Sequence, residues 1–134
     1  MRERDPARPL HVTVWGENIH ERLEDDVRAR YPQGMHAAIA DGIAALLGDS
    51  ARTATATLQE PEHGLAQAVL DDTDVLTWWG HAAHDEVDDA VAERAASNHP
   101  RGDCGLPGPA RPIHGAGAAH RTALAITRWT SEWW

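Results

Sequence analysis

The sequence predicts an α/β domain in three layers, in which a parallel sheet lies between helices. Three strand-like segments, at 10–15, 51–58 and 75–79, alternate with segments whose apolar residues recur at helical spacing. This alternation is the pattern of a parallel sheet with helices on its faces. A chain of 134 residues has room for one such domain.

Each of the three strands is predicted from a different pattern. Segment 10–15 alternates apolar and polar residues with a period of two and ends at Gly16. In segment 51–58 threonine alternates with alanine, which suits a strand because β-branched residues favour a pleated backbone. Segment 75–79, Val-Leu-Thr-Trp-Trp, is a compact apolar run that ends at Gly80, as expected of a strand buried on both faces.

Two helices are predicted between the first and second strands. One spans 21–31, with Leu23 and Val27 on one face, and the Pro-Gln-Gly sequence that follows interrupts it. The other begins after this interruption and ends at Gly48, which is placed to cap it. Its apolar stripe, at positions i, i+4, i+7 and i+8, consists of Ile39, Ile43, Leu46 and Leu47.

Two further helices are predicted after the later strands. A turn at 60–64 leads into a short helix that is closed by the Asp-Asp-Thr-Asp sequence at 71–74. Segment 85–96 starts with an acidic first turn, which is favourable at the positive end of a helix dipole. Val87 and Val91 are expected to point inward from this last helix.

The character of the chain changes at about residue 96. Residues 97–134 contain five Gly and four Pro and have no alternating strand pattern. We therefore interpret 1–96 as the amino-terminal part of the α/β domain. Segment 97–134 is expected to be disordered or poorly packed, because few apolar residues are available to offset chain entropy.

The charge and the apolar content limit the classes of partner. The net charge is −9, and the acidity lies in the first 96 residues. Such a domain does not neutralise phosphate backbones, so nucleic acid is not expected as a partner. We find no apolar run of membrane-spanning length and no secretion signal, so we expect a cytoplasmic protein without a membrane partner. A small-molecule ligand fits this composition, and assembly into a homo-oligomer stays open.

Residues whose side chains can act as acids, bases or metal ligands lie where the predicted strands end. Ligands of open parallel sheets bind beyond the carboxyl ends of the strands, which are here followed by 15–20, 60–63 and 80–84. These segments are rich in imidazole and carboxylate groups, which act as acids, bases and metal ligands. The candidate site residues are Trp15, Glu17, His20, Glu60, Glu62, His63, Trp79, His81 and His84.

Within this set we expect a catalytic role for Glu17, His81 and His84. The two histidines stand three residues apart at a strand-to-helix junction, a spacing compatible with joint ligation of a divalent metal such as zinc. The other candidates are expected to bind the substrate, and they are Trp15, His20, Glu60, Glu62, His63 and Trp79. The alternative interpretation is that all of them are polar loop residues that cap helices and solvate turns.

The aromatic and glycine residues of the strand ends refine this hypothesis. Because successive residues of a strand point to opposite faces, at least one of Trp78 and Trp79 is expected to pack in the core. The glycines are isolated, and neither a G-x-G-x-x-G nor a Walker sequence occurs. The sequence therefore does not support a nucleotide cofactor.

Four strings at these segments match a known family. They are Val-Trp-Gly-Glu-Asn-Ile-His-Glu at 14–21, Tyr-Pro-Gln-Gly-Met-His at 31–36, Thr-Ala-Thr-Leu-Gln-Glu-Pro-Glu-His-Gly-Leu at 55–65, and Thr-Asp-Val-Leu-Thr-Trp-Trp-Gly-His-Ala-Ala-His at 73–84. Over about residues 10 to 95 the chain resembles the ThuA-like trehalose-utilisation family. One departure is Gly16, where that family commonly has Asn.

The resemblance implies a flavodoxin-like fold of the class I glutamine amidotransferase type and a role in bacterial sugar catabolism, without settled amidotransferase chemistry. We therefore expect a protein that binds or processes trehalose or a related carbohydrate. Two alternatives remain, a non-functional truncated fragment and a small metal-binding module.

The resemblance also implies that the family's sheet continues beyond the part present here, so that this domain is incomplete. Reading the gene one base forward can turn 106–111 into Phe-Leu-Val-Leu-His, which resembles the family's next buried strand. We therefore hypothesise that the tail is frameshifted, and the nucleotide sequence tests this hypothesis.

Overall fold

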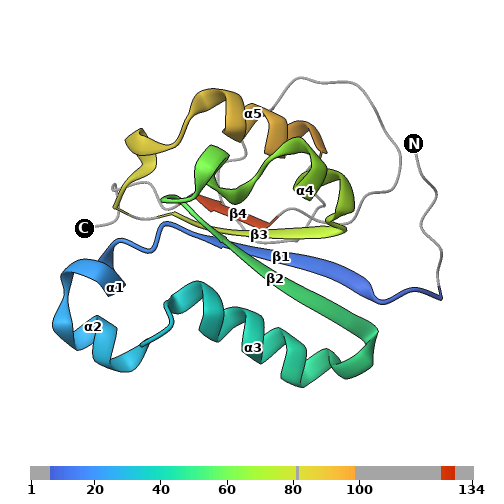
Figure 1. Ribbon diagram of the computed structural model, residues 1–134, viewed down its shortest axis with the longest axis horizontal. Coiled ribbons are helices and arrows are strands. Elements are labelled where there is room, and N and C mark those ends of the chain that lie inside the picture. The colour runs from blue at the N-terminus through green and yellow to red at the C-terminus, as the bar shows by residue number, and fades with distance from the viewer. Residues whose placement is uncertain (1–6, 81, 99–124, 129–134) are drawn as a thin grey trace.

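The computed structural model describes residues 7–80, 82–98 and 125–128, and a parallel sheet forms its centre (Figure 1). The strands are β1 (Leu10–Gly16), β2 (Ala51–Thr57), β3 (Val75–Gly80) and the short β4 (Ala125–Arg128). They lie in the order β2-β1-β3-β4, and every neighbouring pair is parallel. The carboxyl ends of all four strands therefore meet at one edge of the sheet.

Helices cover both faces of this sheet (Figure 1). α3 (Met35–Leu47) lies on one face, and α4 (Gln67–Asp72) and α5 (Asp89–Asn98) lie on the other. α1 (His20–Leu23) and α2 (Asp25–Arg30) lie at the carboxyl-end edge, between β1 and α3. Short 3₁₀ turns occupy Gly48–Ser50, Pro61–Gly64 and His84–Glu86. The prediction of an α/β fold with a parallel sheet between helices is confirmed.

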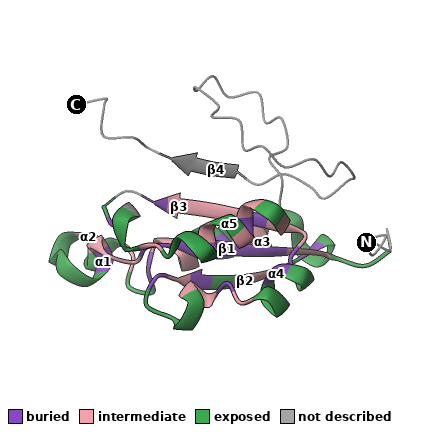
Figure 2. Ribbon diagram, turned by 90° about the horizontal axis from the view of Figure 1, so that it is seen from above, coloured by how far each residue is buried: buried purple, intermediate pink, exposed green. Residues whose placement is uncertain are grey.

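Two apolar clusters, one on each face of the sheet, hold the layers together. Figure 2 shows that the central strand β1 is mostly buried, whereas the helices expose much of their surface. On the α3 side the buried residues are Val12, Val14, Ala40 and Ala51. On the α4 and α5 side they are Trp15, Ala56, Leu58, Leu65, Leu70, Leu76, Ala83, Val91 and Ala95. Alternate residues of β1 thus serve opposite clusters, as a strand with a period of two requires.

The prediction of one continuous helix over 21–31 is wrong, because the segment forms two short helices. Glu24 has an extended backbone (φ −111°, ψ 118°), which divides the segment into α1 and α2. The guanidinium of Arg28 donates to the carbonyl oxygens of Glu21 and Arg22, at 3.3 and 2.6 Å. A continuous helix would use these two carbonyls for its own backbone bonds. Leu23, which the predicted helix placed on one face with Val27, is 76% exposed.

The helix that ends near Gly48 is confirmed, but of the four residues of its predicted apolar stripe only Ile43 packs against the core. Leu46 is 86% exposed, and Ile39 and Leu47 are also exposed. The helix packs through the small Ala40 and the half-buried Ile43 instead. Short side chains let the helix approach the alanine-rich β2, and the large apolar residues are thereby turned outward.

The last predicted helix begins later than expected. α5 starts at Asp89 rather than at residue 85, although Val91 is buried and Val87 packs against the core as predicted. β4 lies in the segment for which we expected no strand, and its sequence Ala-Ile-Thr-Arg contains two β-branched residues. The rest of the predicted tail, 99–124 and 129–134, lies outside the described residues.

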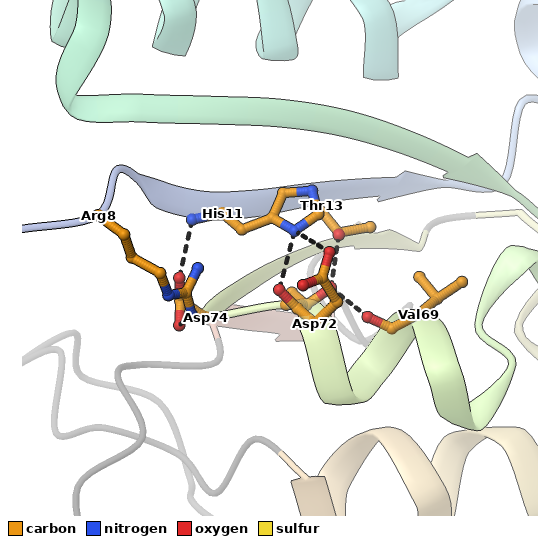
Figure 3. Close-up of polar contacts among 7 residues, drawn as sticks. Arg8, His11, Thr13, Val69, Asp72 and Asp74 are labelled. Carbon is orange, nitrogen blue, oxygen red and sulfur yellow. Dashed lines mark hydrogen bonds and ion pairs between the residues drawn. The ribbon is translucent and has the colours of Figure 1, made fainter. Parts of the chain in front are cut away.

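At the amino ends of the strands, polar contacts bind β1 to the turn that precedes β3 (Figure 3). Asp74 accepts the backbone N–H of His11 at 2.8 Å and pairs with Arg8 at 2.7 Å. The buried hydroxyls of Thr13 and Thr73 lie 2.7 Å apart, and the Thr73 hydroxyl donates to the carbonyl of Val69. This network fixes the register of β3 beside β1, so that both strands deliver their carboxyl-end loops to the same place.

Candidate functional site

Glu17, the residue after β1, connects the end of β1 to the loop after β3. The residue is 3% exposed, and its two carboxylate oxygens accept the backbone N–H groups of Ala82 and Ala83 at 2.8 and 3.1 Å. Its own backbone N–H donates to the carbonyl of Trp79 at 3.3 Å. Burial of the carboxylate is tolerated because these N–H groups replace the hydrogen bonds of water. The side chain that we expected to be catalytic therefore positions a loop in this structure.

Gln59 brings the loop after β2 to the same place. Its Nε2 donates to the carbonyl of Glu17 at 2.8 Å, and its Oε1 accepts from Nδ2 of Asn18 at 3.4 Å. The loops after β1, β2 and β3 are thus joined by hydrogen bonds. We call the joined segments, residues 17–20, 58–63 and 82–83, the carboxyl-end rim. Gln59 was not a predicted site residue, although it lies in one of the strings that carry the family resemblance.

His63 holds the far side of the carboxyl-end rim. Its Nδ1 lies 2.8 Å from the carbonyl oxygen of Leu58, and its Nε2 lies 3.0 Å from the backbone nitrogen of Asp88. A backbone nitrogen can only donate, so Nε2 accepts and the ring hydrogen sits on Nδ1. The carbonyl of His63 also accepts the indole N–H of Trp15 at 3.0 Å. Both ring nitrogens are therefore engaged within the chain.

The two acidic candidates after β2 have different contacts. Glu60 accepts the backbone N–H and the hydroxyl of Thr57 at 2.6 and 3.1 Å, which closes the turn. Glu62 pairs with Arg94 of α5 at 2.7 Å. Glu62 and His63 both have positive φ, 50° and 54°, although neither is glycine. Consecutive left-handed residues store strain, which proteins often keep in functional turns.

The remaining described candidates lie at different depths. Trp15 has no exposed surface and stacks on Trp78 with ring centroids 4.0 Å apart, so it supports the rim from beneath. Trp78 is the tryptophan that packs against the core, as we expected of at least one of the pair. Trp79 is half-buried on the opposite face of β3. His20 pairs through Nδ1 with Glu24 at 2.7 Å, so its ring turns toward α1 and α2.

The predicted metal ligands cannot be placed with the rest. His81 lies outside the described residues, and of His84 only the backbone is described, at the start of a 3₁₀ turn. Among the residues that the structure describes, no three or more His, Cys, Asp or Glu side chains are arranged to hold a metal ion. A metal held by His81 or His84 stays a prediction.

Beside the end of β1 lies an open pocket of about 430 Å³ that the sequence did not predict. Pro32 and Gly34 form part of its lining. Its polar lining consists of Asn18, Glu21, Arg22, Arg28, Gln33 and His36. Gln33, together with Pro32 and Gly34, comes from the break between α2 and α3, which we had treated only as the end of a helix. Asn18 precedes α1, and the remaining residues belong to α1, α2 and α3.

His36 lies where this pocket meets the strand. A Cβ atom added at Gly16 would lie 3.2 Å from Cβ of His36, and one added at Gly34 would lie 2.3 Å from its Cε1. Within the described part of the chain, the buried Nδ1 of His36 has no hydrogen-bond partner. The Pro-Gln-Gly-Met-His string was the available sequence signal for this pocket. Gly34 has a φ of 92° and no Cβ, so the ring of His36 can lie close to its backbone.

Comparison with known proteins assigns no family. No protein-family model matches the chain, and no curated protein matches it. None of the helices in the described ranges is long and apolar enough to cross a membrane. The fold and the site define a parallel α/β protein whose strand-end loops are joined by hydrogen bonds beside an open pocket.

Proposed function

We propose that this protein binds a small carbohydrate, trehalose or a related sugar, at the carboxyl-end rim and serves in sugar utilisation. The observation that carries the proposal is the hydrogen-bonding of Glu17, which joins the loop after β1 to the loop after β3. β1 and β3 are the strands between which the chain changes direction across the sheet. Ligands of open α/β sheets bind at this switch point.

The fold supports the same assignment. The strand order β2-β1-β3-β4 agrees with the flavodoxin-like order, in which ligands bind beyond the β1 and β3 ends. The strings at 14–21, 55–65 and 73–84, which carry the resemblance to the ThuA-like family, supply most of the carboxyl-end rim. A ThuA-like role is therefore the proposal that accounts for both the sequence and the arrangement of the loops.

The chemistry of the rim suits recognition of a polyhydroxyl ligand. Gln59 and Asn18 present amide groups at the edge, and Trp79 offers a half-buried aromatic face. Amides exchange hydrogen bonds with sugar hydroxyls, and flat apolar faces pack against sugar rings. Glu17 acts as a positioning residue in this proposal, because both of its oxygens are engaged by the backbone. No reaction step is assigned to it.

Calorimetric titration of the full chain with trehalose and with glucose tests the proposal. We expect saturable binding that weakens in Gln59→Ala, because this variant releases the loop after β2 from Glu17. The matched control is Gln67→Ala, since Gln67 bonds to Asp71 and Asn98 on α4 and α5. Absence of saturable binding for both sugars, or equal weakening in the two variants, would contradict the proposal.

A further inference from the structure

We propose that the pocket beside β1 binds an anionic oxygen group, a phosphate or a carboxylate, of the sugar held at the carboxyl-end rim. This inference rests on the proposed function and adds the substrate class. The pocket and the rim share Asn18, which lines the pocket and bonds to Gln59. One ligand can therefore reach both places.

The inference depends on the guanidinium of Arg22, which is the cation that would bind the anionic group. Its side chain is exposed and lines the pocket. Within the described ranges its guanidinium has no hydrogen bond or ion pair. Arg28, which also lines the pocket, differs, because it already bonds to two carbonyls and to Asp25 at 3.2 Å. Arg22 is thus a cation available to a ligand, and its planar donors match the oxygens of phosphate and carboxylate.

The one acidic residue of the pocket lining and two acidic residues close to it in the sequence are already engaged. Glu21 lines the pocket, but its carboxylate accepts the backbone N–H of Met35 at 2.8 Å. Asp25 pairs with Arg28, and Glu24 pairs with His20. In a chain with a net charge of −9, most of the surface repels anions. Arg22 beside paired carboxylates is therefore a local exception to the charge of the protein.

The neutral part of the lining also favours a ligand rich in acceptors. Gln33 contributes an amide, and His36 contributes an imidazole whose buried Nδ1 has no partner in the described part of the chain. A buried polar atom without a partner costs free energy, and a ligand that supplies a hydrogen bond recovers it. A volume of about 430 Å³ falls within the range that small-molecule ligands occupy.

Titration calorimetry of the full chain with glucose, glucose 6-phosphate, gluconate and inorganic phosphate tests the inference. We expect the favoured anionic sugar to bind at least roughly tenfold more tightly than glucose, because a charge-assisted hydrogen bond adds that much. Glucose 6-phosphate and gluconate distinguish a phosphate site from a carboxylate site. Added salt should weaken the anionic sugar more than glucose, since exposed charges are screened.

Substitutions of Arg22 test whether the preference for the anionic sugar depends on this residue. Arg22→Gln is expected to remove the preference for the anionic sugar, and Arg22→Lys is expected to keep part of it. The matched control is Arg30→Gln, which removes the same charge from the exposed end of α2 and lies outside the pocket lining. Circular dichroism verifies that each variant is folded. Equal losses in Arg22→Gln and Arg30→Gln, or an unchanged preference in Arg22→Gln, would overturn the inference.

The outcomes separate the two proposals. Sugars that bind without any preference for an anionic group overturn this inference and leave the proposed function standing. Inorganic phosphate that binds with dependence on Arg22, while no sugar binds, supports an anion site and removes the carbohydrate role. Absence of binding for every probe removes both.

Discussion

The carboxylate of Glu17 accepts the backbone N–H of Ala82 at 2.8 Å, and this contact joins two loops that are 65 residues apart in the sequence. The second oxygen accepts the next N–H along the loop, so the carboxylate caps two consecutive backbone donors. A side chain at the end of one strand thereby fixes the loop that follows its neighbour. The carboxyl-end rim depends on this contact.

Replacing Glu17 by Gln is expected to lower the free energy of unfolding by about 2 kcal/mol. The amide keeps one acceptor oxygen, but its NH₂ group opposes the second backbone N–H, and the charge that strengthens both bonds is lost. Urea denaturation measures the change. Glu93→Gln, at an exposed site on α5, is the control and should stay within about 0.5 kcal/mol of wild type. Equal effects of the two substitutions would contradict the positioning role.

The buried threonine pair at the amino ends of the strands predicts an order of stabilities. Because the Thr73 hydroxyl donates its hydrogen to Val69, the Thr13 hydroxyl must be the donor between the two threonines. Thr73→Val therefore leaves both Thr13 and the Val69 carbonyl without this partner, and we expect a loss of about 2–3 kcal/mol. Thr13→Val removes one bond only and should cost about 1 kcal/mol. Thermal unfolding of both variants checks the order, which the reverse ranking would refute.

His63 is predicted to be a neutral imidazole with its hydrogen on Nδ1. This tautomer is the less common one in water, and here it follows from the N–H of Asp88, which needs an acceptor at Nε2. Long-range ¹H–¹⁵N correlation spectra distinguish the two ring nitrogens. A protonated Nε2 in the folded chain would mean that the bond to Asp88 does not form in solution.

Two substitutions of glycine by alanine are expected to change the free energy of unfolding in opposite directions. Gly34→Ala is expected to destabilise the chain by more than about 1 kcal/mol, because the residue has φ of 92° and the new Cβ would lie 2.3 Å from Cε1 of His36. Gly42→Ala lies inside α3 with no atom within 4 Å of the added Cβ, and it should stabilise by about 0.5–1 kcal/mol. Chemical denaturation of the pair measures both. A shared sign would contradict the described backbone at one of the two positions.

The strands could be predicted from the sequence because their signals are local. The period of two in β1 and the apolar run of β3 are visible without any knowledge of the partners. The inner face of α3 could not be predicted this way, because hydrophobicity alone selected Leu46 whereas packing selected Ala40. The break at Glu24 depends on Arg28 and two backbone carbonyls, which is a contact that periodicity does not reveal.

The candidate site was predictable as a place but not as a set of roles. The carboxyl-end rule directed attention to one edge of the sheet, and Glu17, Glu60 and His63 do lie there. The rule does not state whether a side chain faces a ligand or holds the backbone, and these three hold the backbone. Arg22 and His36 escaped prediction because they lie within α1 and α3 rather than in a strand-end loop, although the pocket that they line lies beside the end of β1.

Mapping of backbone amide shifts during a titration of the ¹⁵N-labelled full chain with trehalose tests the central proposal most directly. We predict that amides at 17–20, 58–63 and 82–83 shift together with one binding constant, because they belong to one joined edge. Amides at the opposite end of the strands, such as those of His11 and Asp74, should not move. Shifts confined to that opposite end, or no saturable shifts at all, would contradict a sugar site at the carboxyl-end rim.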